Sequence, residues 1–271
     1  MSKRIAFIGG GNMASAIIGG LISQGHAPSQ IDVVEPVAET RDKLKTAYGV
    51  NAQAEPGAFL IEAGLVIWAV KPQTFRAAAL QVRPHVQQAL HLSVAAGIRS
   101  DSIVNWLGTQ RVVRAMPNTP ALIGKGISGL FARPAVTAAE KQQVVEVMAS
   151  TGELVWIDVE EKLDIVTALS GSGPAYAFYF MEAMTTAGAE MGLKRDQAQQ
   201  LAVATFIGAG ELVRSSGEAP RVLRQRVTSK NGTTDAAINS MEDDDLQAVF
   251  INAMYAARRR AQELGDEFGK A

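Results

Sequence analysis

Apolar residues in the first 160 positions come in short continuous runs, separated by stretches with helical periodicity. Runs such as IAFI and LVIWAV contain no alternating polar residue, which is typical of strands buried on both faces of a parallel sheet. We predict strands at residues 4–8, 31–34, 65–70, 90–95, 111–115, 128–132 and 154–157, and helices at 14–24, 37–48, 72–84 and 137–150. This alternation predicts an α/β fold with a doubly wound, parallel sheet.

The pattern changes after about residue 160, where no convincing strand recurs. Helical periodicity predicts helices over residues 160–169, 174–191, 195–215, 232–241 and 245–265. Pro174 just inside one predicted helix and Gly192 just beyond its end follow the usual terminal preferences of these residues. Apolar residues lie on more than one face of the helix over 195–215, so we expect it to pack on the first domain or on a second copy of the chain.

Length and charge limit the classes of function. The chain has 271 residues, enough for two domains, which we place at 1–160 and 161–271. Its 26 basic and 27 acidic residues are spread without the basic stripe that nucleic-acid binding requires. The uncharged run over 5–31 is interrupted by six glycines, which does not suit a membrane helix. Only four apolar residues precede the first three glycines, which is too short for the core of a signal peptide. We therefore expect a cytoplasmic protein without nucleic-acid or membrane partners.

The counts of cysteine and histidine exclude further chemistry. The chain has no Cys, which excludes disulfides, thiolate nucleophiles and thiolate metal sites. Its three histidines, His26, His85 and His91, show no metal-ligand spacing, so we expect no metal. Whatever the second half does, it does without imidazole.

A glycine-rich segment carries the sharpest signal in the first half. Gly9, Gly10, Gly11, Asn12, Met13 and Ala14 fit the dinucleotide pattern G-x-G-x-x-A between a predicted strand and a predicted helix. Residues without a Cβ permit a tight turn and close approach of the pyrophosphate, and the helix directs its free N–H groups at the anion. The pattern favours a Rossmann-type coenzyme domain over an ordinary Gly-rich turn.

Glu35 ends the second predicted strand, 21 residues after Ala14. A carboxylate at this position accepts hydrogen bonds from the adenosine ribose and repels a 2′-phosphate, which favours NAD(H) over NADP(H). The alternative is a surface Glu in a turn set by Pro36, with Arg41 nearby as a phosphate partner. The choice of coenzyme stays open at this point.

Three more loops follow predicted strands, at the sheet edge where such folds bind ligands. We expect coenzyme contacts from Ala69, Val70, Lys71, Pro72, Ala95, Ala96, Gly97 and Asn118. Asn118 lies in the segment MPNTP, whose two prolines make it a non-helical wall or a rigid connector. Either X–Pro bond is compatible with cis or trans.

Two polar turns precede helices in the second half, at residues 170–176 and 227–234. Free N–H groups and hydroxyls at a helix start suit an anion, although such turns also serve as ordinary caps. The basic residues Arg221, Arg224, Arg226 and Lys230 before the second turn are best interpreted as a solvated face.

Taken together, FIGGGNMA, AVKP, AAGI, MPNTP, SGSGPAY and PRVLRQRVTSKNGTTDAAINSME resemble the pyrroline-5-carboxylate reductase family over the whole chain. The resemblance implies hydride transfer from NADPH or NADH to the cyclic imine 1-pyrroline-5-carboxylate, giving proline. It also implies an all-helical dimerisation domain and therefore a homo-oligomer. Two positions depart from the family pattern: Lys230, where many members have Pro, and Glu35, where many have Ser, Thr or Asn.

The resemblance also implies the substrate site. Backbone N–H groups of Asn231, Gly232, Thr233 and Thr234, together with Ser229, would hold the substrate carboxylate. The Thr234 hydroxyl, as the catalytic group, would hydrogen-bond the ring nitrogen.

Two alternatives to this function remain. A β-hydroxyacid dehydrogenase-like reductase would need a catalytic Lys, and the predicted helix over 174–191 contains none. A dinucleotide-sensing regulator would keep the fold and lose turnover.

Overall fold

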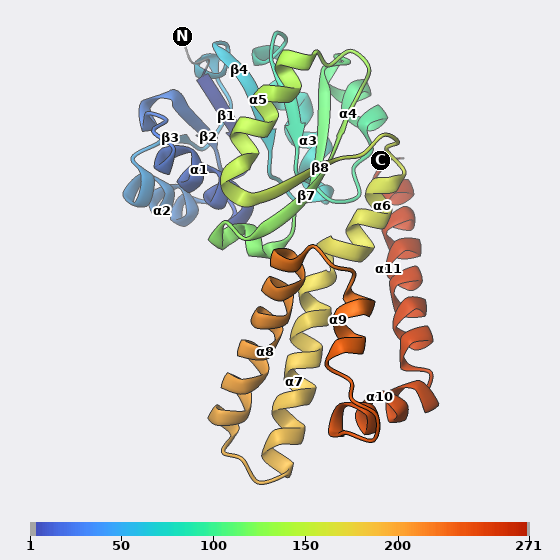
Figure 1. The fold of residues 1–271 in the computed structure, drawn as a ribbon. Helices are drawn as coiled ribbons and strands as arrows, with labels where there is room; N and C mark the ends of the chain where they lie inside the picture. The colour runs from blue at the N-terminus through green and yellow to red at the C-terminus, as the bar shows by residue number, and fades with distance from the viewer. Residues whose placement is uncertain (1–3, 270–271) are drawn as a thin grey trace. The chain divides into compact units, whose positions relative to one another are not determined.

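A computed structural model describes residues 4–269, which form two compact units (Figure 1). The first unit comprises the described residues up to Ser172 and again from Ala257, and the second runs from Gly173 to Ala256. This division differs from the single boundary expected near residue 160. The segment after residue 160 and the end of the chain both contribute contacts to the first unit.

An eight-stranded sheet forms the centre of the first unit, in the order β3-β2-β1-β4-β5-β6-β7-β8. The strands are β1 (Arg4–Ile8), β2 (Ile31–Val34), β3 (Asn51–Gln53), β4 (Ala63–Trp68), β5 (Leu90–Ser93), β6 (Val112–Met116), β7 (Gly126–Ala132) and β8 (Gly152–Trp156). The first six are parallel in the order 3-2-1-4-5-6, which is that of dinucleotide-binding sheets. The predicted α/β class and sheet type are confirmed.

Two features of the sheet were not predicted. β3 escapes sequence reading because its three residues, Asn-Ala-Gln, carry no apolar run. β7 is antiparallel to β6. The connection between them is short, with one 3-10 turn at Thr119–Ile123, and a parallel return needs a much longer crossover.

Helices cover both faces of this sheet. They are α1 (Asn12–Ser23), α2 (Ala38–Tyr48), α3 (Pro72–Val82), α4 (Ser100–Leu107), α5 (Ala138–Met148) and the short α6 (Lys162–Val166). Ile5 and Phe7 of β1 point into one buried cluster with α1, α2 and α5, whereas Ala6 and Ile8 point into another with α3 and α4. This alternation is the two-residue period of a strand buried on both faces.

The second unit is helical. It contains α7 (Gly173–Glu190), α8 (Arg195–Ser216), α9 (Pro220–Arg226), α10 (Thr233–Asp243) and the first half of α11 (Leu246–Gly269). α9 was not predicted, since its PRVLRQR sequence reads as a basic run. Large apolar side chains of α7 are exposed, including Phe178 at 61% and Tyr179 at 71%. Among residues 4–269, no helix combines the length and apolar character needed to cross a membrane.

His91 on β5 is a buried titratable group of the core. Trp68 Nε1 donates a 3.1 Å hydrogen bond to His91 Nδ1. Burial, with a smaller contribution from the charge of Arg111, lowers the His91 pKa to about 3. The imidazole is therefore neutral in the folded protein at physiological pH.

The neutral His91 predicts a dependence of stability on pH. Below pH 6.5 the unfolded chain binds a proton at His91 that the folded protein does not bind, so the free energy of unfolding falls as the pH falls toward 3. The loss from this group reaches about 2 kcal/mol at pH 5. In His91→Gln, the amide oxygen replaces the acceptor for Trp68 without titrating. Urea unfolding at pH 7 and pH 5 should show a smaller loss for this variant, and equal losses would contradict the assignment.

Candidate active site

The residues predicted to bind coenzyme follow the carboxyl ends of β1, β2, β4, β5 and β6, all in the first unit. β1 lies between β2 and β4, so the chain leaves β1 where the strand order reverses. Open α/β sheets bind ligands at this switch point. The topology therefore gathers at one edge the loops that sequence reasoning identified separately.

Gly9 fixes the turn that follows β1. Its φ is +93°, and its N–H donates a 2.8 Å hydrogen bond to the Val34 carbonyl. A Cβ built on Gly9 would lie 2.6 Å from the Ala69 carbonyl oxygen, which leaves room only for glycine. The turn thus joins the ends of three neighbouring strands.

The next residues form an open helix start. Gly11 is the N-cap of α1, no side chain of the described residues caps this helix, and a Cβ on Gly11 would meet no atom within 4 Å. Asn12 is exposed and Met13 half-buried, whereas Ala14 is fully buried against the sheet. Free N–H groups beside open space fit a pyrophosphate. The predicted contact with the pyrophosphate is compatible with this geometry.

Glu35 is only 8% exposed, and its carboxylate is hydrogen-bonded to the glycine-rich turn. Its Oε2 accepts the Gly10 N–H at 2.8 Å, and its Oε1 accepts the Val37 N–H at 2.9 Å. Arg41 Nη1 donates to the Glu35 and Pro36 carbonyls. The alternative of a surface glutamate is therefore wrong. Contact with the ribose stays a prediction.

The loops after β4 and β5 contain further residues that we predicted to contact the coenzyme. Ala69 N–H donates to the Ile8 carbonyl at 2.8 Å, Val70 is half-buried, Lys71 is exposed and Pro72 opens α3. In the next loop, Ala95 is buried, whereas Ala96 and Gly97 are half-buried. These residues lie where the prediction placed them, at the ends of β4 and β5.

Asn118 lies beyond the end of β6. Its Oδ1 accepts the Ile127 N–H at 3.0 Å, so the side chain also braces the start of β7. The Met116–Pro117 and Thr119–Pro120 bonds are both trans. This bracing fits the rigid-connector interpretation of MPNTP, and a contact of Asn118 with coenzyme stays a prediction.

The predicted substrate loop lies in the second unit, between α9 and α10. Gly232 N–H donates to the Ser229 carbonyl at 2.9 Å, and a Cβ on Gly232 would lie 2.6 Å from Ser229 Oγ. Asn231, at φ +62°, donates its N–H to Asp235 Oδ2 at 2.9 Å. Thus two of the four N–H groups predicted to bind substrate already have acceptors within the loop. Sequence reasoning did not identify Asp235.

The first turn of α10 supplies the other two N–H groups of the loop. Gly232 is the N-cap of this 11-residue helix, and within the described residues no side chain caps it. Thr233 and Thr234 occupy its first two positions, whose N–H groups have no intrahelical acceptor. These two groups remain suited to bind an anion.

The Gly/Ser segment at residues 170–176 does not form the open turn that we expected. Thr167–Gly171 is a π-helical turn, in which the Ser172 N–H donates to the Thr167 carbonyl at 2.8 Å. The Ser170 hydroxyl donates to the Val166 carbonyl. These two donors are therefore already used within the chain.

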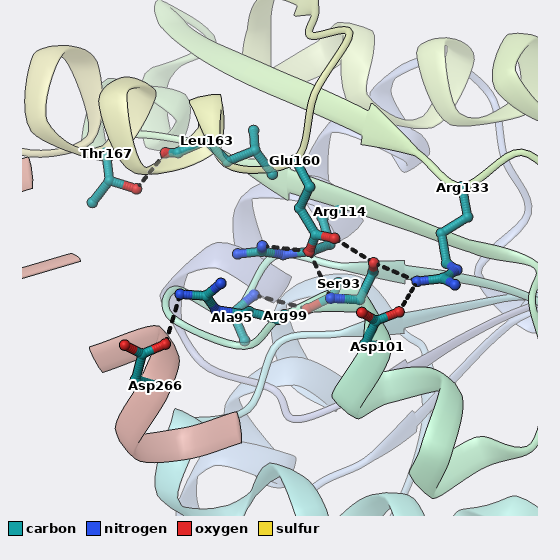
Figure 2. A network of polar contacts seen from close by, with 11 residues as sticks. Ser93, Ala95, Arg99, Asp101, Arg114, Arg133, Glu160, Leu163, Thr167 and Asp266 are labelled. Atoms are coloured by element: carbon teal, nitrogen blue, oxygen red, sulfur yellow. Dashed lines mark hydrogen bonds and ion pairs between the residues drawn. The ribbon is translucent and has the colours of Figure 1, made fainter. Parts of the chain in front are cut away.

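One polar network, at the start of α4 next to the loop predicted to bind coenzyme, was not predicted. Figure 2 shows Glu160 beside Arg114, and Arg133 beside Asp101. Glu160 Oε1 accepts Arg114 Nη1 at 2.7 Å and the Ser100 N–H at 2.6 Å. The partners are 46 and 60 residues from Glu160, so no local pattern signals them. The network ties β6 and the start of α4 to the segment that leads into α6.

Two family models match this chain. One, described as pyrroline-5-carboxylate reductase dimerisation, covers residues 160–264. The other, described as NADP oxidoreductase coenzyme F420-dependent, covers residues 4–97. The second match contains the glycine-rich turn, Glu35 and the loops after β4 and β5.

Individual proteins match over nearly the whole length. A pyrroline-5-carboxylate reductase of Pseudomonas aeruginosa is 43% identical over 271 residues, which cover 99% of both chains. The solved structure of such a reductase from Coxiella burnetii has a TM-score of 0.90 at 36% identity, covering 97% of this chain and 99% of that chain. A pyrroline carboxylate reductase of Plasmodium falciparum, solved with NADP bound, has a TM-score of 0.86 at 26% identity, with 97% and 98% coverage.

Proposed function

Because this chain belongs to the pyrroline-5-carboxylate reductase family, we propose that it reduces 1-pyrroline-5-carboxylate to L-proline with NADH or NADPH. The reaction is the last step of proline biosynthesis. One observation supports the coenzyme half most directly: the uncapped start of α1 beside Gly11, at the switch point of the sheet. A dinucleotide fits this edge because the free N–H groups and the open space lie together.

The residue types suit reduction of an imine. A bound nicotinamide coenzyme supplies the hydride. A C=N bond is readily protonated, and the resulting cation accepts hydride, so the protein needs to orient the ring, bind its carboxylate and exclude water. None of these tasks requires a thiol or imidazole, and this chain has no Cys at all.

We assign the substrate to the loop between α9 and α10. The N–H groups of Thr233 and Thr234, at the positive end of α10, bind the carboxylate, with Ser229 beside them. The Thr234 hydroxyl donates a hydrogen bond to the ring nitrogen of the neutral imine. When that nitrogen is protonated, the hydroxyl oxygen accepts the hydrogen bond instead. Thr234 is thus the residue closest to the reacting bond in this proposal.

Replacing Thr234 tests this role. Thr234→Ala should lower kcat/KM for the imine about ten- to a hundredfold, because the loss of one hydrogen bond costs about 1–3 kcal/mol. Thr234→Ser keeps a hydroxyl and should retain most of the activity. Steady-state kinetics at saturating coenzyme measure both variants. Thr234→Ala with wild-type kinetics would remove Thr234 from the mechanism.

Glu35 favours NADH over NADPH in this proposal. Its carboxylate is buried and fixed by two backbone N–H groups at the end of β2, next to the predicted ribose position. A 2′-phosphate placed there would be repelled by the negative charge. The ratio of kcat/KM for the two coenzymes measures this preference.

We propose that the homo-oligomer is a dimer formed through the second unit. The exposed apolar side chains of α7 and α8, among them Phe178, Tyr179, Leu201 and Ile207, make a surface that an isolated subunit would leave in water. Light scattering measures the number of subunits. We place the dimer in the cytoplasm, because its soluble coenzyme and its biosynthetic substrate are found there.

The assay that tests the function is oxidation of NADH and NADPH in the presence of 1-pyrroline-5-carboxylate, with proline identified as product. A dinucleotide-sensing regulator would bind coenzyme without turnover. A β-hydroxyacid dehydrogenase-like reductase would instead oxidise an alcohol, for which α7 offers no Lys as a base. Absence of proline would reject the proposed reaction.

A further inference from the structure

The loop that joins β5 to α4 borders the coenzyme site and contains Ala95, Ala96 and Gly97. In a sheet of this order, the strands β1, β2 and β3 form one mononucleotide half and β4, β5 and β6 form the other. With adenosine at the end of β2, the loop after β5 faces the nicotinamide half. The position of this loop therefore matters for the reacting end of the coenzyme, if the proposed function holds.

The last turns of α11 lie directly on this loop. A Cβ built on Gly97 would lie 3.3 Å from Leu264 Cβ and 3.4 Å from Phe268 Cδ2. Gly97 has a φ of +72°, a conformation that favours glycine. Phe268 also packs against the buried cluster that contains Ala95 and Ile98. The last turns of α11 thus cover the loop, and Phe268 packs on the same buried cluster as Ala95 and Ile98.

A polar contact and a glycine also allow α11 to pack closely against the end of this loop. Figure 2 shows Arg99 reaching Asp266, and the Nη2–Oδ1 distance is 2.8 Å. Gly265 is buried on the helix face toward Arg99, where a Cβ would lie 3.0 Å from Nε. The absence of a side chain at 265 lets the helix come this close. Arg99 is the residue that precedes α4, so the contact is at the end of the loop.

The loop has weak support of its own. The Ala95 N–H donates to the Ser93 hydroxyl at 3.3 Å, which is long for such a bond. Ser100, the first residue of α4, is held from outside the loop by Glu160. The conformation of Ala95, Ala96 and Gly97 therefore depends on segments that follow in sequence by more than 60 residues.

We infer that Leu264 and Phe268, at the end of α11, are positioning residues for the coenzyme loop after β5. Both lie close enough to Gly97 to leave little room for a side chain there, Phe268 also packs on the core below it, and together they set the conformation in which the loop receives the nicotinamide half. Loosening this contact weakens coenzyme binding. It leaves the affinity for the imine unchanged, because the predicted substrate groups lie on another unit.

Phe268→Ala tests the inference in the full-length enzyme, because it removes the ring that lies against Gly97 and the core. Titration calorimetry with NADH and with NADPH, without substrate, should show a Kd about tenfold above that of the wild type. The KM for coenzyme should rise similarly while the KM for the imine does not, and amide hydrogen exchange at residues 95–98 should become faster. Phe268→Leu, a smaller deletion, should give the same pattern at about threefold, and it serves if the alanine variant does not fold.

Arg260→Ala is the matched control. Arg260 lies on the exposed face of the same helix and pairs with Glu263 and Glu267, so its loss should leave both Kd values unchanged. A Kd within twofold of wild type for Phe268→Ala would overturn the inference, as would an equal change for Arg260→Ala. Calorimetry separates this result from the proposed function, because binding is measured without turnover. Failure to reduce the imine would reject the function alone.

Discussion

Gly9→Ala is expected to weaken the binding of NADH and NADPH more than a hundredfold. At φ +93° an L-residue is strained, which costs about 1–3 kcal/mol. The new Cβ would also lie 2.6 Å from the backbone carbonyl of Ala69, which has no flexible end to move away. The ends of β1 and β4 must then separate, and this opens the turn that we propose as the pyrophosphate cradle.

Gly11→Ala provides a matched comparison within the same fingerprint. Gly11 has a φ of −69°, and its Cβ would meet nothing within 4 Å, so the protein without coenzyme should keep its thermal stability. Binding should still weaken, because the added methyl group occupies the space where the pyrophosphate approaches. Thermal unfolding without coenzyme and calorimetry with coenzyme separate the two effects. Equal thermal stability of Gly9→Ala and wild type would contradict the strain argument.

Glu160→Gln is expected to lower the free energy of unfolding by about 3 kcal/mol, toward the lower end of the range for breaking a buried ion pair. The side chains of Arg114 and Glu160 are only 8% and 18% exposed. The amide would leave the Arg114 charge without its partner. It would also weaken the bonds that Ser100 makes to the carboxylate. Urea unfolding at a fixed protein concentration measures the change, because an oligomer's apparent stability depends on concentration.

Two further variants sharpen this result. Glu39→Gln removes an exposed carboxylate paired with Lys43 on α2, and it should leave unfolding unchanged within error. The double variant Arg114→Met with Glu160→Met should recover much of the loss, because no unpaired charge stays buried. A destabilisation by Glu160→Gln that is no greater than that of Glu39→Gln would show that the pair contributes little.

The sequence predicted those elements whose signal is local. β1 and β2 were predicted to the residue, because each is a short, mostly apolar run that ends at glycine or at a charged residue. β3 is too short and polar for this signal, and α9 is masked by its basic residues. The direction of β7 depends on pairing with β6, which no periodicity of one strand reveals.

The same distinction applies to the site. The loops that we predict to bind coenzyme do follow strands of the sheet, because the apolar runs before them are a local signal. The bonds of Glu35 to the Gly10 and Val37 N–H groups were not predicted, since a turn sequence does not show which way a carboxylate points. Asp235 accepts the N–H of Asn231 in the predicted substrate loop. Because the two residues are only four positions apart, the sequence could have suggested this hydrogen bond. Glu160 has partners too distant in sequence for any local signal.

The return of the last residues to the first unit has a consequence for synthesis of the protein. The 84 residues of the second unit, Gly173 to Ala256, are synthesised before Leu264 and Phe268. At about 5–20 residues per second, the ribosome needs roughly 4–17 s for this stretch. The nascent sheet therefore waits with the loop after β5 uncovered until Leu264 and Phe268 have been made. Synthesis of these two residues, rather than emergence of the sheet, is the point from which the first unit can finish folding.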